Sequence, residues 1–241
     1  MSELEQGVLV DRRHGVATIT LSHPERANAL DPAEFHALAN VLVELASEPD
    51  LVAVVLTGQG ARAFCAGLNL RNAEAIQQDL SSQGPTGLSA ALRASAALPV
   101  PLIGRINGAC VAGGMGLLGA CDQVVAVDTA RFCLPEINHG IYPDVAMAGL
   151  HGRGASSVVR RLADSGAMID SAAALDAGLV DSVVASAQLD GAVEDVLSSV
   201  RSGQMPARFS ARRATDGAAH LARLEAADAA ARSSTIRIVN S

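Results

Sequence analysis

The stretch from Arg105 to Asp122 constrains the fold of this chain most strongly, because it places a run of glycines where a strand turns into a helix. The apolar residues 101–104 predict the end of a buried strand, and Leu117 and Leu118 predict a helix after the glycines. Glycine permits backbone angles that other residues avoid and lets a ligand approach the main chain. The first N–H groups of a helix have no partner within it. The stretch therefore predicts either a backbone site for a phosphate or an oxyanion, or close packing of a helix on a sheet.

Predicted strands and helices alternate along the chain, which is typical of an α/β fold. Strands are predicted at 8–10, 16–21, 51–57, 124–127, 130–134 and 180–184. Helices are predicted at 31–47, 88–98, 145–163, 171–177, 189–201 and 206–232. Asp31 precedes Pro32 and lies three residues before Glu34, a pattern that predicts the start of the first helix. Residues 71–90 carry Gln-Gln, Ser-Ser and Gly-Pro pairs and predict a mobile surface segment.

The composition excludes several classes of function. With 241 residues, 49% of them apolar, and a formal charge of −7, the chain can bury a large core but has no basic cluster for nucleic acid. No apolar run reaches the ~18 residues of a membrane span, and residues 1–7 are too acidic for a secretory signal. The four cysteines form no CxxC pair, and no histidine cluster completes a metal site. These features predict a cytoplasmic protein with reduced thiols and no metal, which binds neither nucleic acid nor a membrane.

A series of short motifs carries a resemblance to a known family. They are Pro-Glu-Arg-Ala-Asn-Ala-Leu at 24–30, Ala-Phe-Cys-Ala-Gly-Leu-Asn-Leu at 63–70, Ile-Asn-Gly at 106–108, Ala-Gly-Gly-Met-Gly at 112–116, Cys-Asp at 121–122, Phe-Cys-Leu-Pro-Glu at 132–136 and Ala-Leu-Asp-Ala-Gly-Leu-Val-Asp at 174–181. Each motif alone is modest evidence, but their order and spacing together are highly specific. The chain resembles the crotonase superfamily, the enoyl-CoA hydratase/isomerase family, over nearly its whole length.

The resemblance implies an α/β fold of ββα units stacked into a crotonase-like spiral, followed by a C-terminal helical region. The spiral core with the CoA-thioester site would span residues 1–185, and a short trimerisation or lid region would span 186–241. Residues 202–241 are rich in Ala and Arg and show little of the apolar pattern of the family's closing helices. The implied assembly is a homotrimer or a hexamer, and the implied ligand is an acyl-CoA thioester. Coenzyme A is then part of the substrate, so no separate cofactor is expected.

The same resemblance assigns binding residues by position. The backbone N–H groups of Leu68 and Gly113 match the family's oxyanion hole, which stabilises the enolate of the thioester. The other implied coenzyme A and substrate contacts are Arg26, Ala27, Ala29, Ala66, Gly67, Gly114 and, through its carbonyl, Leu68. Tyr142 is interpreted either as a plug in the acyl pocket or as a core residue.

The acidic residues favour one branch of the family's chemistry. Hydratases of the family use two glutamates, which match Gly116, where the carboxylate is missing, and Glu136. Asp144, eight residues after Glu136, matches an aspartate of the family's dienoyl-CoA isomerases. A double-bond shift needs proton removal at one carbon and delivery at another, which one or two carboxylates can perform without activating water. Isomerisation with Glu136 and Asp144 as catalytic residues is therefore the favoured hypothesis.

Alternatives to this hypothesis stay open. Asp144 could equally cap the helix predicted from Val145. The chain could be a hydratase, or another crotonase-type lyase, in which Glu136 serves as both acid and base. It could also be a non-catalytic acyl-CoA-binding homologue that kept the scaffold after losing an acid. The sequence does not specify acyl chain length or branching.

Overall fold

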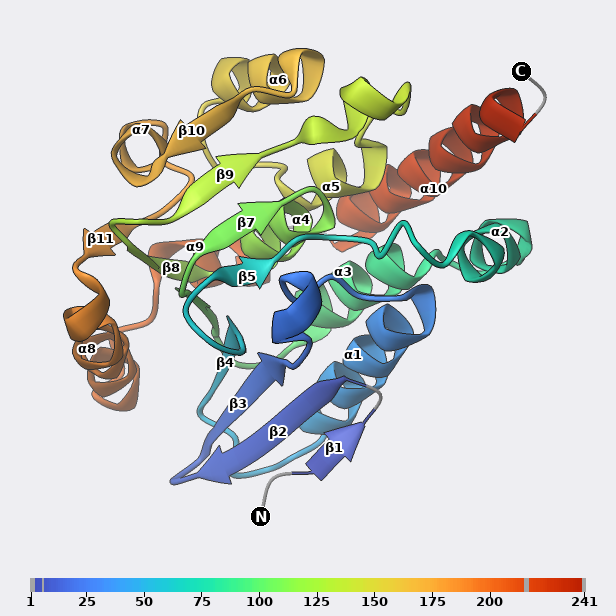
Figure 1. Cartoon of the computed structure of the whole chain (residues 1–241). Helices are drawn as coiled ribbons and strands as arrows, with labels where there is room; N and C mark the ends of the chain where they lie inside the picture. The colour runs from blue at the N-terminus through green and yellow to red at the C-terminus, as the bar shows by residue number, and fades with distance from the viewer. Residues whose placement is uncertain (1–2, 6, 215–216, 240–241) are drawn as a thin grey trace.

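Two β-sheets and the helices that cover them form the computed structural model, which describes residues 3–5, 7–214 and 217–239 (Figure 1). Over these residues the larger sheet has seven strands in the order β1-β2-β3-β4-β6-β8-β11, and the smaller sheet has four in the order β10-β9-β7-β5. The strands are β1 (Glu3–Glu5), β2 (Val8–Arg13), β3 (Val16–Leu21), β4 (Ala53–Gly58), β5 (Ala63–Cys65), β6 (Leu102–Ile106), β7 (Ala109–Val111), β8 (Gln123–Val127), β9 (Arg131–Cys133), β10 (Met168–Asp170) and β11 (Ser182–Val184). The helices are η1 (Pro24–Arg26), α1 (Pro32–Leu45), α2 (Ala73–Ser81), α3 (Gly87–Ala97), α4 (Gly113–Ala120), η2 (Pro135–His139), α5 (Asp144–Gly149), α6 (Ser156–Ser165), α7 (Ser171–Asp176), η3 (Ser186–Gln188), α8 (Leu189–Arg201), α9 (Ala207–Ala214) and α10 (Gly217–Val239), where η marks a 3-10 helix.

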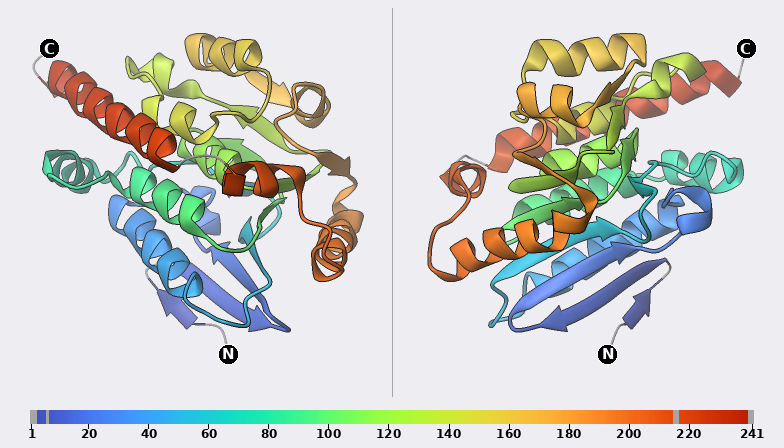
Figure 2. Two further views of the ribbon diagram at one scale, coloured as in Figure 1. Left: turned by 180° about the vertical axis from the view of Figure 1, so that it is seen from behind. Right: turned by 60° about the vertical axis from the view of Figure 1, so that its left-hand side comes forward.

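Successive strand pairs contribute to the two sheets in turn. In the pairs β4–β5, β6–β7 and β8–β9, the first strand joins the large sheet and the second joins the small sheet. Strands β3, β4, β6, β8 and β11 run parallel, as do β5, β7 and β9. Helices follow each pair, so the ββα units wind into the α/β spiral that the sequence predicts. Seen from behind (Figure 2), α1, α3 and α10 lie side by side across one face of the molecule.

The core is built mainly from aliphatic side chains, because aromatic residues make up only 2% of the chain. All six residues of β4 are buried, as expected for a parallel strand covered on both faces. Three of the four phenylalanines, Phe35, Phe64 and Phe132, are at most 1% exposed. The strands therefore form a firm platform from which loops extend, and loops on such a platform commonly carry function.

Most of the predicted strands and the start of the first helix are confirmed. The predicted hairpin appears as β2 and β3, and the strands predicted at 51–57 and 124–127 appear as β4 and β8. Asp31 is the N-cap of α1, and its N–H donates to Glu34 Oε2 at 2.7 Å. The three-residue strands β1, β5, β7 and β10 are not predicted, because so short a run shows no clear alternation.

Two helix predictions are wrong in their bounds. The single helix predicted at 145–163 is two helices, α5 and α6, because Gly152 and Gly154 adopt positive φ between them. The helix predicted to start at Leu117 begins at Gly113. Nearly all of α4 is buried, so tertiary packing offsets the low helix propensity of its glycines.

The segment 71–90, predicted as mobile surface, is largely helical. It contains α2 and the start of α3. Asn72 caps α2, since its side chain accepts a hydrogen bond from Ala75 N at 3.3 Å. No residue of α2 is buried, so the polar composition marks a surface helix rather than an irregular segment.

The helix α10 packs on the core through a buried polar cluster. Leu224 and Ala227 contribute apolar contacts toward α3 and α5. Asp228 is 2% exposed and accepts hydrogen bonds from Thr86 Oγ1 at 2.7 Å and Ser89 Oγ at 2.8 Å. The weak apolar pattern of this region is therefore accompanied by hydrogen bonds that fix the helix in place.

The predicted boundary between residues 185 and 186 falls where β11 gives way to η3 and α8. Beyond it, α9 and α10 return to the helical layer that covers the large sheet (Figure 2). Within the described parts of the chain, no helix combines the length and the apolar character needed to cross a bilayer.

Candidate active site

Two loops that leave strands of the small sheet lie against one another. One follows β5 and contains Gly67 and Leu68, and the other follows β7 and enters α4 at Gly113. Gly67 has φ +84°, and a methyl group placed on it would lie 2.7 Å from Gly113 N. Neither Leu68 N–H nor Gly113 N–H donates a hydrogen bond to any residue that the structure describes. The two N–H groups predicted to form an oxyanion hole are therefore unpaired and lie on touching loops.

The backbone of Ala112 turns the chain from β7 into α4. Ala112 has φ 53° and ψ −124°, a conformation that costs a residue other than glycine roughly 1–3 kcal/mol. Its N–H donates to Cys133 O at 3.0 Å, and Met115 N–H donates to Ala112 O at 2.9 Å. These bonds hold the strained residue in place and leave Gly113 N–H at the open end of α4. An alanine carries no sequence signal for positive φ, so the sequence does not predict this feature.

The predicted coenzyme A loop, which begins with η1, is joined to the oxyanion loop by main-chain hydrogen bonds. Ala66 N–H donates to Ala27 O at 3.0 Å, and Leu30 N–H donates to Gly67 O at 2.8 Å. Asn28 is fully buried between the loops, and its Nδ2 donates to the backbone of β5 at 2.8 Å. The two loops therefore form one unit. Asn28, which belongs to the family motif at 24–30, is a positioning residue whose role has no local signal in the sequence.

Arg26 is held by carboxylates at the start of α1. Its Nη1 donates to Asp31 Oδ2 at 3.2 Å, and its Nη2 donates to Glu34 Oε2 at 2.5 Å. Glu34 Oε1 also lies 2.6 Å from His23 Nε2. The two carboxylates partly neutralise the guanidinium, so a phosphate of coenzyme A would compete with them for Arg26.

Glu136 lies in η2, directly after β9. Its Oε2 is buried and accepts no hydrogen bond within the described residues. Burial raises the pKa of Glu136 from 4.5 to about 7. A carboxyl group that titrates near neutral pH can both take up and release a proton. Glu136 is therefore suited to general acid–base chemistry.

Asp144 and Tyr142 lie at the start of α5. Pro143 occupies the N-cap position, so the alternative that Asp144 caps this helix is wrong, because Asp144 is its first helical residue. Burial raises the pKa of Asp144 above its usual value. Tyr142 packs against the main core, and burial, followed by the negative charge of Asp164, raises its pKa. These contacts favour the core interpretation of Tyr142 over the plug.

Gly116, at the position of the missing hydratase glutamate, lies where α4 and α5 approach backbone to backbone. A methyl group placed on Gly116 would lie 3.1 Å from Ala146 Cα. One placed on Gly149 would lie 2.7 Å from Gly116 O. A larger side chain at 116 would have to displace α5, so the absence of this carboxylate is tied to the packing of the two helices.

Leu88 of α3 forms an apolar wall beside the oxyanion loops. A methyl group placed on Gly113 would lie 3.3 Å from Leu88 Cδ2, and one on Gly116 would lie 3.6 Å from it. Leu88 is half-buried. An apolar side chain in this place would exclude water from a thioester carbonyl group bound at the oxyanion loops. The sequence does not indicate this role of Leu88, because Leu88 lies in the polar segment 71–90.

Metal and thiol chemistry find no support at this site. Within the described residues, no group of three or more His, Cys, Asp or Glu side chains could hold a metal ion. The four cysteines are free and buried, and burial raises the pKa of Cys65, next to the oxyanion loop, to about 12. Cys65 is therefore a thiol that packs in the core rather than a nucleophile.

Known proteins are similar to this chain in sequence and in fold. A family model described as enoyl-CoA hydratase/isomerase matches residues 11–232. The carnitinyl-CoA dehydratase of Proteus mirabilis (strain HI4320) is 32% identical over 190 residues, which cover 77% of this chain and 71% of that protein. The putative enoyl-CoA hydratase/isomerase YngF of Bacillus subtilis (strain 168) is 30% identical over 189 residues, covering 77% and 72%. The crystal structure of an enoyl-CoA hydratase from Mycobacterium avium subsp. paratuberculosis K-10 aligns with a TM-score of 0.81 at 26% identity, covering 98% of this chain and 91% of that chain.

The matched range begins in β2 and ends in α10, so it includes both oxyanion loops and Glu136. The structural alignment covers nearly the whole chain and therefore includes both sheets and the C-terminal helices. The motifs, the spiral of ββα units and these matches lead to one conclusion. The chain belongs to the enoyl-CoA hydratase/isomerase family, the crotonase superfamily.

Proposed function

We propose that this protein shifts a double bond in an acyl-CoA thioester through an enolate held at Leu68 and Gly113. The observation that carries the proposal is the partly buried carboxyl group of Glu136, whose Oε2 is buried without a hydrogen-bond partner in the described residues and whose pKa is raised to about 7. The two N–H groups would receive the negative charge that develops on the thioester oxygen, and one such donor contributes about 10²–10³-fold to kcat in other enzymes.

The proposed reaction of a 3-enoyl-CoA takes two proton transfers. Ionised Glu136 removes a proton from carbon 2, and the electron pair of that C–H bond delocalises toward the thioester oxygen. The resulting dienolate accepts a proton at carbon 4, and the double bond moves into conjugation with the thioester. The proton is returned by Glu136 or by Asp144, whose raised pKa also supports proton transfer.

The lack of an acid at Gly116 supports isomerisation over two-glutamate hydration. Water addition places a hydroxyl group and a proton on two carbons, and the family's hydratases use two glutamates for it. A Cβ atom at 116 would lie 3.1 Å from Ala146 Cα, so the first of these side chains would require α5 to shift. A double-bond shift needs no activated water, so Glu136 and Asp144 suffice for it.

A second candidate function is reversible hydration with Glu136 as both acid and base. The observation that favours it is the 32% identity to a protein named carnitinyl-CoA dehydratase. In this case Glu136 would protonate a departing hydroxyl group at carbon 3, and the α-proton would leave through the same carboxylate. The oxyanion hole would serve the same enolate.

The experiment that tests the proposal measures two substrates side by side. With 3-hexenoyl-CoA, isomerisation predicts a rise in the absorbance of the conjugated thioester. With crotonyl-CoA, a loss of that absorbance would instead indicate hydration. Glu136→Gln should abolish either activity, whereas Glu44→Gln, an exposed charge change on α1, should retain it. Hydration alone would replace the isomerase proposal with the second candidate.

We also propose the homotrimer or hexamer that the family resemblance implies. The support is the family membership together with a C-terminal region that forms helices. Light scattering coupled to size-exclusion chromatography should give three or six times the mass of one chain, and the mass of a monomer would contradict this proposal.

A further inference from the structure

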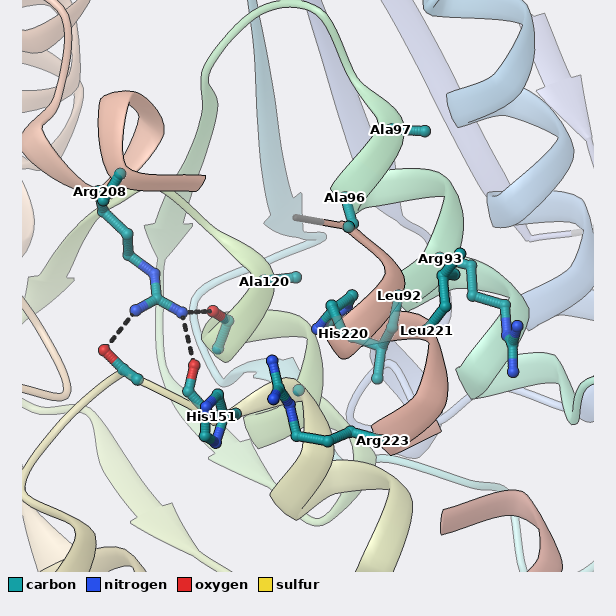
Figure 3. A pocket seen from close by; sticks show the side chains of 15 residues that line it. Leu92, Arg93, Ala96, Ala97, Ala120, His151, Arg208, His220, Leu221 and Arg223 are labelled. Carbon is teal, nitrogen blue, oxygen red and sulfur yellow. Dashed lines mark hydrogen bonds between the residues drawn. The ribbon is translucent and has the colours of Figure 1, made fainter. Parts of the chain in front are cut away.

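A cavity of about 460 Å³ lies away from the candidate active site, between α3, α4 and α5 on one side and α9 and α10 on the other (Figure 3). It is lined by Gly119 at the end of α4 and by Gly149 at the end of α5. The oxyanion residue Gly113 is at the opposite end of α4, and an eight-residue helix is about 12 Å long. The cavity is therefore separate from the thioester site, and its volume is typical of small-molecule sites, which span roughly 300–1,000 Å³.

The cavity combines apolar walls with a cluster of basic side chains. Leu92, Ala96, Ala120 and Leu221 contribute apolar surface. The polar side chains of the lining are Arg93, Arg208, Arg223, His151 and His220. No acidic residue belongs to the described lining. An anion with an apolar body is the class of ligand that suits such a combination.

Two of the three arginines already have partners. Arg208 donates from Nη1 to Gly152 O at 2.6 Å and from Nη2 to Gly119 O at 2.8 Å (Figure 3). These carbonyls lie at or just beyond the C-terminal ends of α4 and α5, where the helix dipole is negative. Arg93 lies 3.5 Å from Asp228 Oδ2 and 3.8 Å from Glu225 Oε1. The guanidinium of Arg93 thus faces carboxylates, and that of Arg208 is hydrogen-bonded to main-chain carbonyls.

The third arginine, Arg223 of α10, has no such hydrogen-bond or ion-pair partners among the described residues. It forms no hydrogen bond or ion pair with any residue that the structure describes, and its Nε is buried without a partner. In Figure 3 its guanidinium group lies between His151 and His220, whereas Arg93 points away from them. A buried donor without a partner carries a free-energy cost that an acceptor in the cavity would remove.

Two histidines lie beside Arg223 in the cavity lining. Burial lowers the pKa of His220, and the charge of Arg223 lowers it further. Burial, followed by Arg223 and Arg208, lowers the pKa of His151. Both imidazoles are therefore neutral at pH 7, and each can donate one N–H. The guanidinium of Arg223 and these two N–H donors suit a carboxylate, whose two oxygens can accept hydrogen bonds from them.

We propose that this cavity binds an aliphatic monocarboxylate, with the carboxylate on Arg223 and the histidines and the chain against Leu92, Ala96 and Ala120. The apolar part of the lining favours a carboxylate on an aliphatic chain over inorganic phosphate. The planar guanidinium binds a carboxylate well through paired N–H donors. The site is distinct from the thioester site, so the proposal does not depend on the isomerase or hydratase assignment.

The test measures hexanoate binding to the full chain by titration calorimetry, without any CoA thioester present. Hexanoate should bind, and Arg223→Gln should weaken its binding about tenfold or more, since it removes a charged hydrogen bond. Arg201→Gln is the matched control, because Arg201 lies on α8 and pairs with Glu194. It should bind hexanoate as the wild type does. Melting curves check that each variant is folded, and Arg223→Lys provides a second variant that retains the charge and should retain part of the affinity.

Probes of different chemistry test whether the charge and the aliphatic chain of hexanoate both contribute to binding. Hexanol lacks the charge and inorganic phosphate lacks the chain, so both should bind at least tenfold more weakly than hexanoate. Ala96→Leu, which fills part of the wall, should weaken hexanoate binding. No binding of hexanoate, equal binding of hexanol or of phosphate, or unchanged binding in folded Arg223→Gln would each overturn the proposal.

Discussion

At the scale of single residues, the candidate site depends on groups in unusual environments. Glu136 has a buried carboxyl oxygen, Oε2, without a hydrogen-bond partner in the described residues, and Ala112 has a backbone conformation that alanine rarely adopts. Such features cost free energy of folding and persist only where surrounding contacts hold them in place. In enzymes they concentrate at active sites. Ala112 follows β7 and directly precedes Gly113, and Glu136 follows β9, the neighbouring strand of the small sheet.

The raised pKa of Glu136 gives opposite predictions for activity and stability. In the proposed mechanism the ionised form is the base, so turnover should rise with pH through about pH 7. The folded state binds this proton more tightly than the unfolded chain, whose glutamate titrates near 4.5, so stability is lost as pH rises through about 7. Glu136→Gln should therefore raise Tm at pH 8 by a few degrees and lose this advantage at pH 4.5. Melting curves at both pH values test this, and a lower Tm for the variant at pH 8 would contradict it.

Gly67 is predicted to be required for the geometry of the oxyanion hole. A methyl group on Gly67 would press on Gly113 N at 2.7 Å, so Gly67→Ala should lower kcat by about 10²-fold. Gly60→Ala is the matched control, because Gly60 has nearly the same φ, +80°, but a methyl group there meets only Pro24 Cβ at 3.9 Å. Equal loss of activity in the two variants would mean that backbone strain, rather than the oxyanion loops, is responsible.

At the scale of secondary structure, the contact between α4 and α5 links the missing acid to the architecture. Gly116, Gly119 and Gly149 let the two helices meet at backbone distance. The N-terminal end of α4 carries Gly113, and the N-terminal end of α5 carries Asp144. Close packing therefore fixes the position of Asp144 relative to the oxyanion loops while it excludes a side chain at 116.

Restoring the hydratase glutamate should not restore hydration. Gly116→Glu forces a side chain against Ala146 Cα and should lower the free energy of unfolding by about 1–3 kcal/mol. Gly191→Glu on α8 is the control, because a methyl group on Gly191 meets nothing within 4 Å. Urea unfolding and crotonyl-CoA hydration measure the two effects. A stable Gly116→Glu variant with new hydratase activity would contradict the packing argument.

Asp228 is predicted to hold α10 on the helical layer. Asp228→Asn weakens the hydrogen bonds from Thr86 and Ser89 and removes the charge that faces Arg93, at a cost of about 1–3 kcal/mol. Hydrogen exchange should speed up in α10 more than in the strands. Asp195→Asn, an exposed site on α8, should leave the exchange unchanged. Equal exchange in both variants would show that Asp228 does not hold the helix.

At the scale of the whole molecule, the sequence predicts the spiral better than its details. The strand β4 and the helix α1 follow from local patterns, namely a continuous apolar run and a capping box. The three-residue strands of the small sheet do not, because they exist through pairing with distant segments. The break between α5 and α6 is not predicted either, because it depends on the positive φ angles that Gly152 and Gly154 adopt in the folded chain.

In the candidate site, too, some features follow from the sequence and others depend on packing in the folded chain. The family motifs identify Leu68, Gly113 and Glu136, because their positions follow from the order of ββα units. The wall residue Leu88 and the positive φ of Ala112 depend on packing between units and have no local signal. The basic cavity is formed by α3, α4, α5, α9 and α10 together, so no single stretch of sequence indicates it.

The central claim is that Glu136 exchanges a proton with a thioester enolate held by Leu68 and Gly113. The most direct test incubates hexanoyl-CoA with the protein in D₂O and follows deuterium at carbon 2 by mass spectrometry. We expect exchange with the wild type and with Glu44→Gln, and a loss of about 10²-fold or more with Glu136→Gln. Undiminished exchange in Glu136→Gln, or tight thioester binding without exchange in the wild type, would contradict the account.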